Sequence, residues 1–362
     1  MKKITFFICT LSSGGAEHQM SILANFLSDK GYRIEIVTFG DEDDHYQLRP
    51  NIVRTRLAEK KPSWRKALAI FFFFLTVKTD CIISFSQRAN ALMLPAMFFR
   101  PKVTVIAGER NFTVGPSDGI ERVLFCLLYK RANWIVPNSY SQGDYITQKR
   151  PKLKNRIKVI TNYTDLEEYQ FKPLKSSGKL KIGVFCRYAP QKNYSRFLRV
   201  IAKLKTEGYQ DYEVHWYGNI QKLGNSNPDF VAFNTFVEEY ELESIVITHN
   251  STKNVPNILP LYDVLCLPSL FEGFSNSLSE YICCGRPVLA SDVSDNHLMV
   301  HNGENGFLFN PEDEESIADA IRKILALTNE ERELMGATSR RIAESLFNKE
   351  TFIEAYTRLI ED

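Results

Sequence analysis

Short apolar runs alternate along the chain with longer segments whose apolar residues recur every three or four positions. In the first half, the runs predict strands near 3–9, 33–39, 81–85, 102–107, 133–137 and 157–160. Helical spacing there predicts helices near 16–29, 63–78 and 119–130. Strands that alternate with helices form parallel sheets covered by helices. The first half therefore predicts a doubly wound α/β domain.

The alternation stops in a charged, small-residue stretch over 162–179 and then starts again. Second-half strands are predicted near 180–186, 212–217, 245–248, 263–267, 287–291 and 306–309, with helices near 193–207, 229–241, 275–284 and 313–327. We expect an N-terminal Rossmann-like domain over 1–170, a second one over 171–345, and a C-terminal helix within 346–362. Two such domains facing each other form a deep cleft, because ligands bind at the carboxyl ends of parallel strands.

Composition narrows the class of protein. The 362 residues are 44% hydrophobic and 24% charged, which is typical of a globular protein and leaves room for two cores. Seven cysteines fall mostly inside apolar runs and lack the spacing of metal ligands, which favours a reduced, cytoplasmic chain. The longest apolar run, 67–77, is too short to span a membrane.

The net charge of +2 hides an asymmetry between the halves. Residues 1–170 hold 25 Lys and Arg against 16 Asp and Glu, and residues 171–362 hold 20 against 27. A basic half indicates an anionic partner, such as a membrane surface or a phosphorylated substrate.

A glycine turn in the C-terminal third carries two carboxylates eight positions apart, Glu272 and Glu280. The turn follows an apolar strand and leads through Gly273 into a helix whose first amides are those of Asn276, Ser277 and Leu278. Unpaired amides at a helix N-terminus suit a diphosphate. Glu280, a turn further on, is placed to accept hydrogen bonds from sugar hydroxyls, although two solvated carboxylates are the ordinary alternative.

Two cations bracket the loop after the first strand of the second half. Arg187 ends the strand, and Lys192 stands before a predicted helix. The helix dipole disfavours cations at that end, so their placement favours a function. Together they could neutralise a departing diphosphate.

In the first half, Gly14 and Gly15 link the first strand to the first helix. No third glycine follows at the spacing of a dinucleotide-binding loop. The pair therefore indicates only that backbone can approach a ligand closely.

These pieces together resemble the ordered signature of glycosyltransferase family 4. The resemblance rests on Gly14-Gly15-Ala16-Glu17, on Arg187 with Lys192-Asn193, on Glu272-Gly273-Phe274 with Asn276 and Glu280, on Cys284-Gly285-Arg286-Pro287-Val288, and on Asn305-Gly306-Phe307. It covers nearly the whole chain and is strongest over 181–327. It implies the two-domain GT-B fold, a nucleotide-sugar donor held mainly by the second domain, no metal or other cofactor, and transfer with retention at the anomeric carbon.

The resemblance also implies roles. Arg187 and Lys192 would bind the donor diphosphate, Glu280 the ribose, and Glu272 with the Gly273-Phe274 backbone the transferred sugar. The glycine pair would approach the phosphates from the first domain. Many members carry a histidine where this chain has Glu109 and Arg110; similarity to enzymes acting on polyprenol-linked sugars implies acceptor or sugar contacts for these two.

The segment 63–78 allows two interpretations. Trp64, Leu68, Phe71, Phe72 and Leu75 would share one helix face that packs on the sheet, which leaves Ile70, Phe73 and Phe74 to be housed. Flanking cations and the apolar excess are typical of a helix lying in an anionic membrane interface. A fully buried helix is the alternative.

The sequence thus predicts a hexosyltransferase-type enzyme that moves a sugar from a nucleotide diphosphate sugar, with UDP favoured, to a glycan acceptor carried on a polyprenyl diphosphate at the inner face of the cytoplasmic membrane. Such an enzyme would serve surface polysaccharide synthesis, and no nucleic acid is expected as a partner. A sugar-nucleotide epimerase on the same fold and a non-catalytic nucleotide-sugar-binding partner of another transferase are the alternatives.

Overall fold

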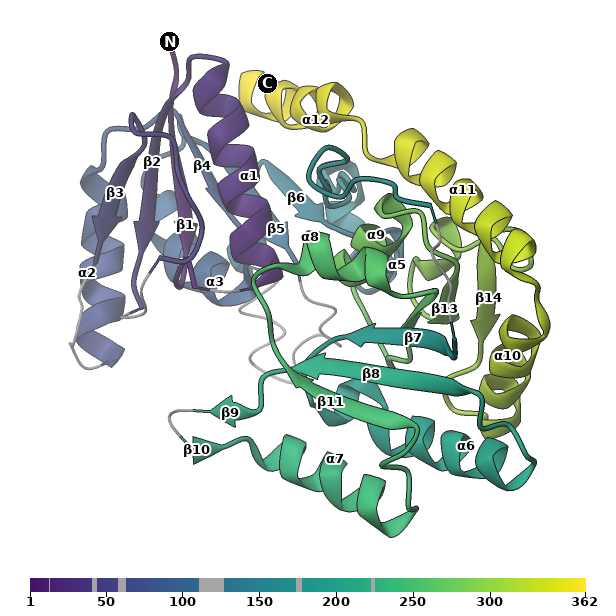
Figure 1. Cartoon of the computed structure of the whole chain (residues 1–362). Coiled ribbons are helices and arrows are strands. Elements are labelled where there is room, and N and C mark those ends of the chain that lie inside the picture. The colour runs from purple at the N-terminus through teal and green to yellow at the C-terminus, as the bar shows by residue number, and fades with distance from the viewer. Residues whose placement is uncertain (13, 41–43, 58–62, 111–126, 174–177, 223–224) are drawn as a thin grey trace. The chain divides into compact units, whose positions relative to one another are not determined.

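The computed structural model describes residues 1–12, 14–40, 44–57, 63–110, 127–173, 178–222 and 225–362. The chain forms two compact units, one of Met1–Tyr163 with Lys349–Asp362 and one of Thr164–Asn348 (Figure 1). The change of unit thus falls seven residues before the 170/171 boundary expected from the sequence. The C-terminal helix belongs to the first unit.

The first unit holds a six-stranded sheet with all strands parallel, in the order β3-β2-β1-β4-β5-β6. Its strands are β1 (Lys3–Ile8), β2 (Arg33–Thr38), β3 (Val53–Arg56), β4 (Cys81–Ser84), β5 (Thr104–Glu109) and β6 (Trp134–Pro137). Its helices are α1 (Gly15–Asp29), α2 (Ser63–Thr76), α3 (Gln87–Met97), α5 (Tyr140–Lys149), the 3₁₀ helix η1 (Pro151–Arg156) and α12 (Lys349–Glu361). From β1 the chain adds β2 and β3 toward one edge of the sheet, and it then returns to add β4, β5 and β6 toward the other edge. The strand order therefore reverses between the neighbours β1 and β4.

Helix α2 packs in the opposite orientation to the one expected. Ile70 and Phe74 are fully buried against the sheet, with the Phe74 ring on Phe7 at 4.7 Å. Trp64 and Phe72, expected to pack on the sheet, are exposed. The buried residues repeat four positions apart, on a helix face rotated from the face that the sequence predicted. The face was not predictable because an almost wholly apolar helix offers several faces of equal hydropathy.

The strand predicted at 157–160 is wrong. This segment runs beside β6 and makes only an isolated bridge at Ile157. The amides of Lys158 and Ile160 donate to the carbonyls of Ile135 and Pro137, at 3.0 and 3.1 Å. Pro137 has no N–H with which to return a bond, so the ladder cannot propagate. The helix predicted at 119–130 lies mostly outside the described residues.

The second unit repeats the plan with a parallel sheet in the order β11-β8-β7-β12-β13-β14. Its strands are β7 (Leu180–Phe185), β8 (Tyr212–Gly218), β11 (Val246–Asn250), β12 (Val264–Leu267), β13 (Val288–Ser291) and β14 (Gly306–Phe309), with a small ribbon of β9 (Gln221–Lys222) and β10 (Asn225–Ser226). Its α-helices are α6 (Tyr194–Thr206), α7 (Pro228–Glu239), α8 (Val255–Ile258), α9 (Asn276–Cys283), α10 (Glu314–Ala326) and α11 (Asn329–Leu346). The short 3₁₀ helices are η2 (Pro190–Lys192), η3 (Leu259–Leu261) and η4 (Asn296–Leu298). Here the strand order reverses between β7 and β12.

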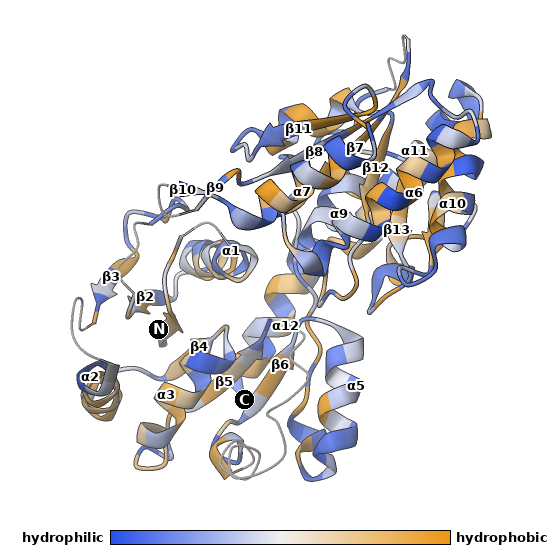
Figure 2. Cartoon of the chain, turned by 90° about the horizontal axis from the view of Figure 1, so that it is seen from below, coloured by the Kyte–Doolittle hydropathy of each residue, from blue (hydrophilic) through white to orange (hydrophobic). Residues whose placement is uncertain are grey.

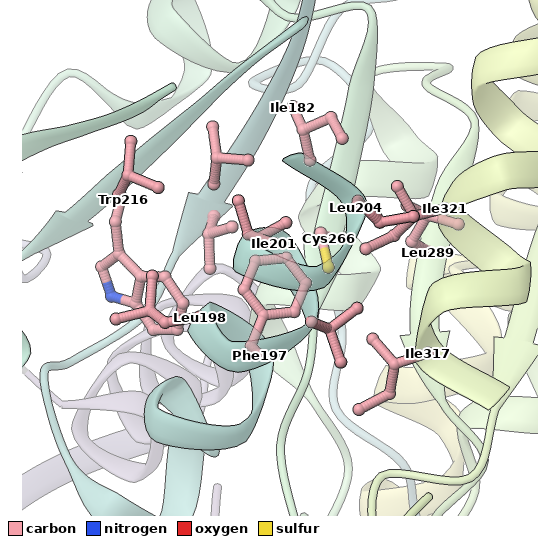
Figure 3. Close-up of a cluster of buried hydrophobic side chains, with 14 of the residues drawn as sticks. Ile182, Phe197, Leu198, Ile201, Leu204, Trp216, Cys266, Leu289, Ile317 and Ile321 are labelled. Carbon is pink, nitrogen blue, oxygen red and sulfur yellow. The ribbon is translucent and has the colours of Figure 1, made fainter. Parts of the chain in front are cut away.

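One face of the second sheet is covered by α6 and α10 (Figure 3). Helix α6 buries Phe197, Leu198, Ile201 and Leu204, at the three- and four-residue spacing of an amphipathic helix. These side chains meet inward-facing strand residues such as Trp216. Burial of this size is the main stabilising term of the unit, at roughly 1.5–3 kcal/mol for each large apolar side chain.

Both doubly wound Rossmann-like domains predicted from the sequence are confirmed. Hydrophobic strands sit between helices with mixed faces, as β5, β6 and α5 show in Figure 2. No helix in the described part of the chain is long and apolar enough to cross a membrane.

Candidate functional site

Two loops of the second unit meet where its strand order reverses. The loop at 186–193 follows β7, and the loop at 268–275 follows the neighbouring β12, so both leave the carboxyl edge of the sheet together. The amide of Leu270 donates to the Gln191 carbonyl at 2.9 Å, and the Gln191 side-chain amide donates to the Phe271 carbonyl at 2.9 Å. These bonds hold the two loops side by side at the position where open α/β sheets bind ligands.

An ion pair joins the loops at their centre. Lys192 Nζ lies 2.6 Å from Glu272 Oε1, and the two side chains are only 11% and 12% exposed. A lysine ammonium carries three donors, so Lys192 can keep Glu272 and still bind a second anion. The geometry thus brings together two residues that are 80 positions apart in the sequence.

Arg187 lies in the first of these loops, directly after the buried Cys186, and is exposed. Within the described part of the chain it makes no hydrogen bond or ion pair. Because Glu272 neutralises Lys192, Arg187 is the cation on this loop whose charge is not compensated by a neighbouring carboxylate. An arginine fork of this kind matches the oxygens of a phosphate.

Helix α9 begins beside the ion pair. Ser275 caps it by accepting a hydrogen bond from the Leu278 amide at 3.3 Å, so that amide is already engaged. The Ser277 hydroxyl donates to the Phe185 carbonyl at 3.1 Å, which ties the helix to β7. Asn276 is the first residue of the helix. Residues 276–278 are therefore ordered at the positive end of α9, where an anion is favoured.

The turn before α9 is fixed from behind. The Gly273 carbonyl accepts a hydrogen bond from Ser294 Oγ at 2.9 Å, and the Phe274 ring is buried next to Phe347. Phe274 therefore anchors the turn through its side chain, and only its backbone is left for a ligand.

Glu280 lies a turn further along α9 and pairs with a residue that the sequence did not indicate. The buried Tyr169 hydroxyl makes a hydrogen bond with its carboxylate. Burial raises the pKa of Glu280 to about 8, and the bond from Tyr169 opposes that rise. Arg340 fixes the tyrosine by donating to the carbonyls of Tyr169 and Cys283, each at 2.8 Å.

The motif Gly285-Arg286-Pro287 has a structural part in the same unit. Gly285 adopts a left-handed φ of 66° just after α9, where a Cβ atom would lie 2.1 Å from the Phe171 ring. Arg286 is buried and donates to the carbonyls of Lys172 and Pro260, at 2.6 and 2.8 Å. It ties two loops to the start of β13.

Gly14 and Gly15 lie in the first unit, where Gly14 is the N-cap and Gly15 the first residue of α1, at that unit's own point of strand-order reversal. The Tyr46 hydroxyl bonds both the amide and the carbonyl of Gly14, at 3.2 and 3.0 Å. Gly14 has an extended φ of −161°, so conformational freedom does not require a glycine there.

Glu109 and Arg110 are buried at the end of β5, in two separate networks. Glu109 accepts hydrogen bonds from the Tyr129 hydroxyl and from Asn90, and burial raises its pKa to about 7. Arg110 bonds Tyr356 of α12 and lies over the Phe85 ring at 4.1 Å. Arg110 thus holds α12 against the first sheet.

Several contributors were missed by sequence reasoning. Tyr169, Gln191 and Arg340 carry no local signal, because their contacts join segments far apart in the chain. Ser275 could have been found, since a serine just before a helix is a common N-cap.

Comparison with known proteins now adds to this geometry. Residues 165–341 match the model of the family "Glycosyl transferases group 1". A Campylobacter jejuni protein named N-acetylgalactosamine-N,N'-diacetylbacillosaminyl-diphospho-undecaprenol 4-alpha-N-acetylgalactosaminyltransferase is 26% identical over 90% of each chain. The second unit, which this match nearly fills, belongs to the group 1 glycosyltransferase family. The resemblance to glycosyltransferase family 4 is confirmed.

Other similarities agree. A second C. jejuni transferase, whose name describes a GalNAc-GalNAc-diNAcBac-PP-undecaprenol acceptor, is 25% identical over 94% of each chain. Among solved structures, Anabaena HepE in complex with UDP and glucose has a TM-score of 0.83 at 17% identity and covers 100% of both chains. Sucrose-phosphate synthase from Thermosynechococcus elongatus has a TM-score of 0.81 at 16% identity, over 100% of this glycosyltransferase and 98% of that chain. These similarities confirm the GT-B fold.

Proposed function

We propose that this glycosyltransferase transfers a hexosyl group from a UDP-sugar, with retention, to a glycan carried on a polyprenyl diphosphate. The observation that carries the proposal is the Lys192–Glu272 ion pair at the strand-order reversal of the second sheet, with Arg187 exposed on the same loop. The names of the two C. jejuni relatives, which include diphospho-undecaprenol acceptors, support the acceptor class. The donor class is supported by the UDP complexes of HepE.

In this proposal the donor diphosphate binds between Arg187, Lys192 and the first turn of α9. Negative charge grows on the leaving phosphate as the bond to the anomeric carbon breaks, and the two cations stabilise it in place. Glu272 keeps Lys192 in position, and the second carboxylate oxygen of Glu272 accepts a hydrogen bond from a hydroxyl of the transferred sugar. Glu280, fixed by Tyr169, receives the ribose hydroxyls.

Retention follows from a front-face displacement in this scheme. The acceptor hydroxyl attacks from the side that the diphosphate leaves, and the departing phosphate oxygen takes its proton. The protein contributes positioning and charge rather than a nucleophile of its own. Glu109 and Arg110 keep their proposed place near the acceptor or sugar, although their observed partners give them a structural part as well.

The test is a set of single substitutions assayed with UDP-sugars and a polyprenyl diphosphate-linked glycan. Arg187→Ala and Lys192→Ala should each lower turnover by about 100-fold or more, as loss of an electrostatic stabiliser does. Lys181→Ala, at an exposed position of β7 outside the two loops, is the matched control for loss of a cation. Turnover within a factor of two of wild type in both variants would refute the mechanism. A thermal-shift screen with UDP, GDP and their sugars identifies the donor independently.

A further inference from the structure

One helical layer covers a whole face of the first sheet. Helices α2, α3 and α5, the 3₁₀ helix η1 and the residues at 127–132 bury their inner side chains in one continuous core with the strands. Figure 2 shows α2 and α3 along the same side of this sheet. The outward side of the layer is therefore a single surface, and its chemistry differs from that of the rest of the unit.

The first feature of this surface is an aromatic patch, formed by Trp64, Leu68, Phe72, Phe98 and Phe99. The first three stand four residues apart on the outer side of α2. Trp64, Phe72 and Phe99 are 61%, 60% and 71% exposed, although large aromatic side chains are usually buried in monomeric proteins.

The two parts of the patch adjoin one another. The Phe99 ring lies 6.2 Å from the Phe71 ring, which touches Phe72 in turn at 5.7 Å. Arg100 donates to the Phe74 carbonyl at 3.0 Å and so ties the end of α3 to the end of α2.

The second feature is a cationic pocket of about 320 Å³ at the end of α5. Five of its seven lining residues are cations: Lys130, Lys149, Arg150, Lys152 and Arg156. None of the seven is acidic. Such a pocket suits a phosphate-bearing group.

Arg131 connects the pocket to the patch. It donates to the carbonyls of Met97 and Arg100, both at 2.6 Å. These bonds hold the segment 127–132, which supplies Lys130 to the pocket, against the end of α3. Residues 63–104 and 127–158, which form the layer and the strands between its helices, contain fourteen lysines and arginines and only two acids, Asp80 and Asp144.

We propose that this surface docks the protein on an anionic lipid bilayer, with the aromatic patch in the interface and a lipid phosphate in the cationic pocket. Apolar side chains flanked by cations are the combination that binds anionic interfaces, since neither signal alone gives stable attachment. Docking of this kind rests on the proposed function, because it would present the enzyme to an acceptor that is anchored in lipid.

Charge decides between a bilayer and a second copy of the chain. In a symmetric dimer the same patch would face itself, which would bring two strongly cationic surfaces together. An anionic bilayer instead neutralises them, and its interface also accepts aromatic side chains.

The experiment measures co-sedimentation of the full chain with vesicles of phosphatidylcholine alone or with added phosphatidylglycerol. Wild type should bind the anionic vesicles and lose binding as salt is raised. Lys149→Gln with Lys152→Gln should weaken binding about 25-fold, since each cation near an anionic surface contributes about a fivefold factor. Trp64→Ser with Phe72→Ser should weaken binding by a similar factor at low salt.

Matched controls separate this surface from general effects. Lys30→Gln with Arg33→Gln removes two exposed cations of the same unit outside the layer, and Val231→Ser with Leu334→Ser removes two exposed apolar side chains of the second unit. Both should bind vesicles as wild type does. Tryptophan emission should shift to the blue on vesicle binding, and Trp64→Phe should abolish most of the shift but keep the binding, because Trp216 is buried and Trp134 is half-buried on β6, outside the patch.

Several outcomes would overturn the proposal. The first is equal recovery of wild type with neutral and anionic vesicles at low salt. The second is unchanged vesicle binding in both the lysine and the aromatic double variants. The third is a wild-type dimer that Trp64→Ser with Phe72→Ser converts to a monomer. Lys192→Ala should still bind vesicles, and the surface variants should still bind UDP. Failure of the docking surface and failure of the proposed function are therefore distinguishable.

Discussion

Glu109 gives the sharpest quantitative prediction, because its carboxyl group is buried within the first unit. Its side chain bonds Tyr129 and Asn90, and burial raises its pKa from 4.5 to about 7. The folded state thus holds the proton more tightly than the unfolded state. The resulting stabilisation is full below about pH 4.5 and is lost as the pH rises through 7. For this pair of pKa values the loss between pH 5 and pH 8 is roughly 2–3 kcal/mol.

Glu109→Gln removes the titration and keeps an oxygen that can accept the Tyr129 hydrogen bond. We expect the free energy of unfolding of the first unit to fall with pH by roughly 2–3 kcal/mol more in wild type than in Glu109→Gln between pH 5 and 8. Comparing the two proteins cancels all groups that titrate alike in both. Urea titrations should be followed by pulsed hydrogen exchange of peptides from β5, so that the second unit does not contribute.

Glu354→Gln on α12 is the control, since Glu354 is an exposed carboxylate of the same unit. It should leave the pH dependence of wild type unchanged. If the difference between wild type and Glu109→Gln stayed constant within about 0.5 kcal/mol across this range, the argument from burial would be refuted.

Three further predictions follow from single contacts. Phe74→Ala should cost about 3–5 kcal/mol of unfolding free energy and Phe72→Ala, on the same helix, less than about 0.5 kcal/mol, as measured by urea unfolding; equal costs would contradict the packing of α2. Tyr169→Phe removes the hydrogen bond that lowers the pKa of Glu280, so Glu280 should take up its proton at a higher pH than in wild type. As the pH is lowered, UDP affinity measured by calorimetry should therefore begin to fall earlier in the variant. An unchanged pH profile would argue against Glu280 as the ribose ligand. Gly306→Ala should destabilise the second unit by more than about 2 kcal/mol in thermal unfolding, because its Cβ would lie 1.9 Å from the Val288 carbonyl oxygen, and a stable variant would contradict the close β13–β14 pairing.

Much of the fold could be predicted because buried parallel strands leave long apolar runs. All six strands of the main second sheet were predicted to within two residues at each end, and α6, α9 and α10 were predicted equally closely. β3, in contrast, is a short edge strand without an apolar run, since Val53 and Arg56 face solvent. Helix α11 begins with a capping box at Thr328 and Glu331, a signal that was present in the sequence but not used.

The candidate site likewise has a part that the sequence could predict and a part that it could not. Motif spacing was sufficient to place Lys192 and Glu272 in the loops that follow β7 and β12, because the alternation of strands and helices indicated both strands. It could not show that they form an ion pair, or that Tyr169 binds Glu280, since those contacts depend on how loops pack. The orientation of α2 could not be predicted either, because a run of four phenylalanines has no unique apolar face.

The charge at the switch point of the second sheet has a consequence for how a diphosphate can be held there. Lys192 is neutralised by Glu272, and Arg187 supplies one uncompensated positive charge on the loop. A nucleoside diphosphate brings about two negative charges that one arginine cannot balance. The remaining stabilisation must therefore come from hydrogen bonds and dipoles, and the described second unit offers them at the remaining Lys192 donors and at the first turn of α9, beside the ion pair. Glu272 then has a reason to be paired: an unpaired carboxylate at that helix terminus would repel the phosphates, whereas the ion pair leaves the local field positive.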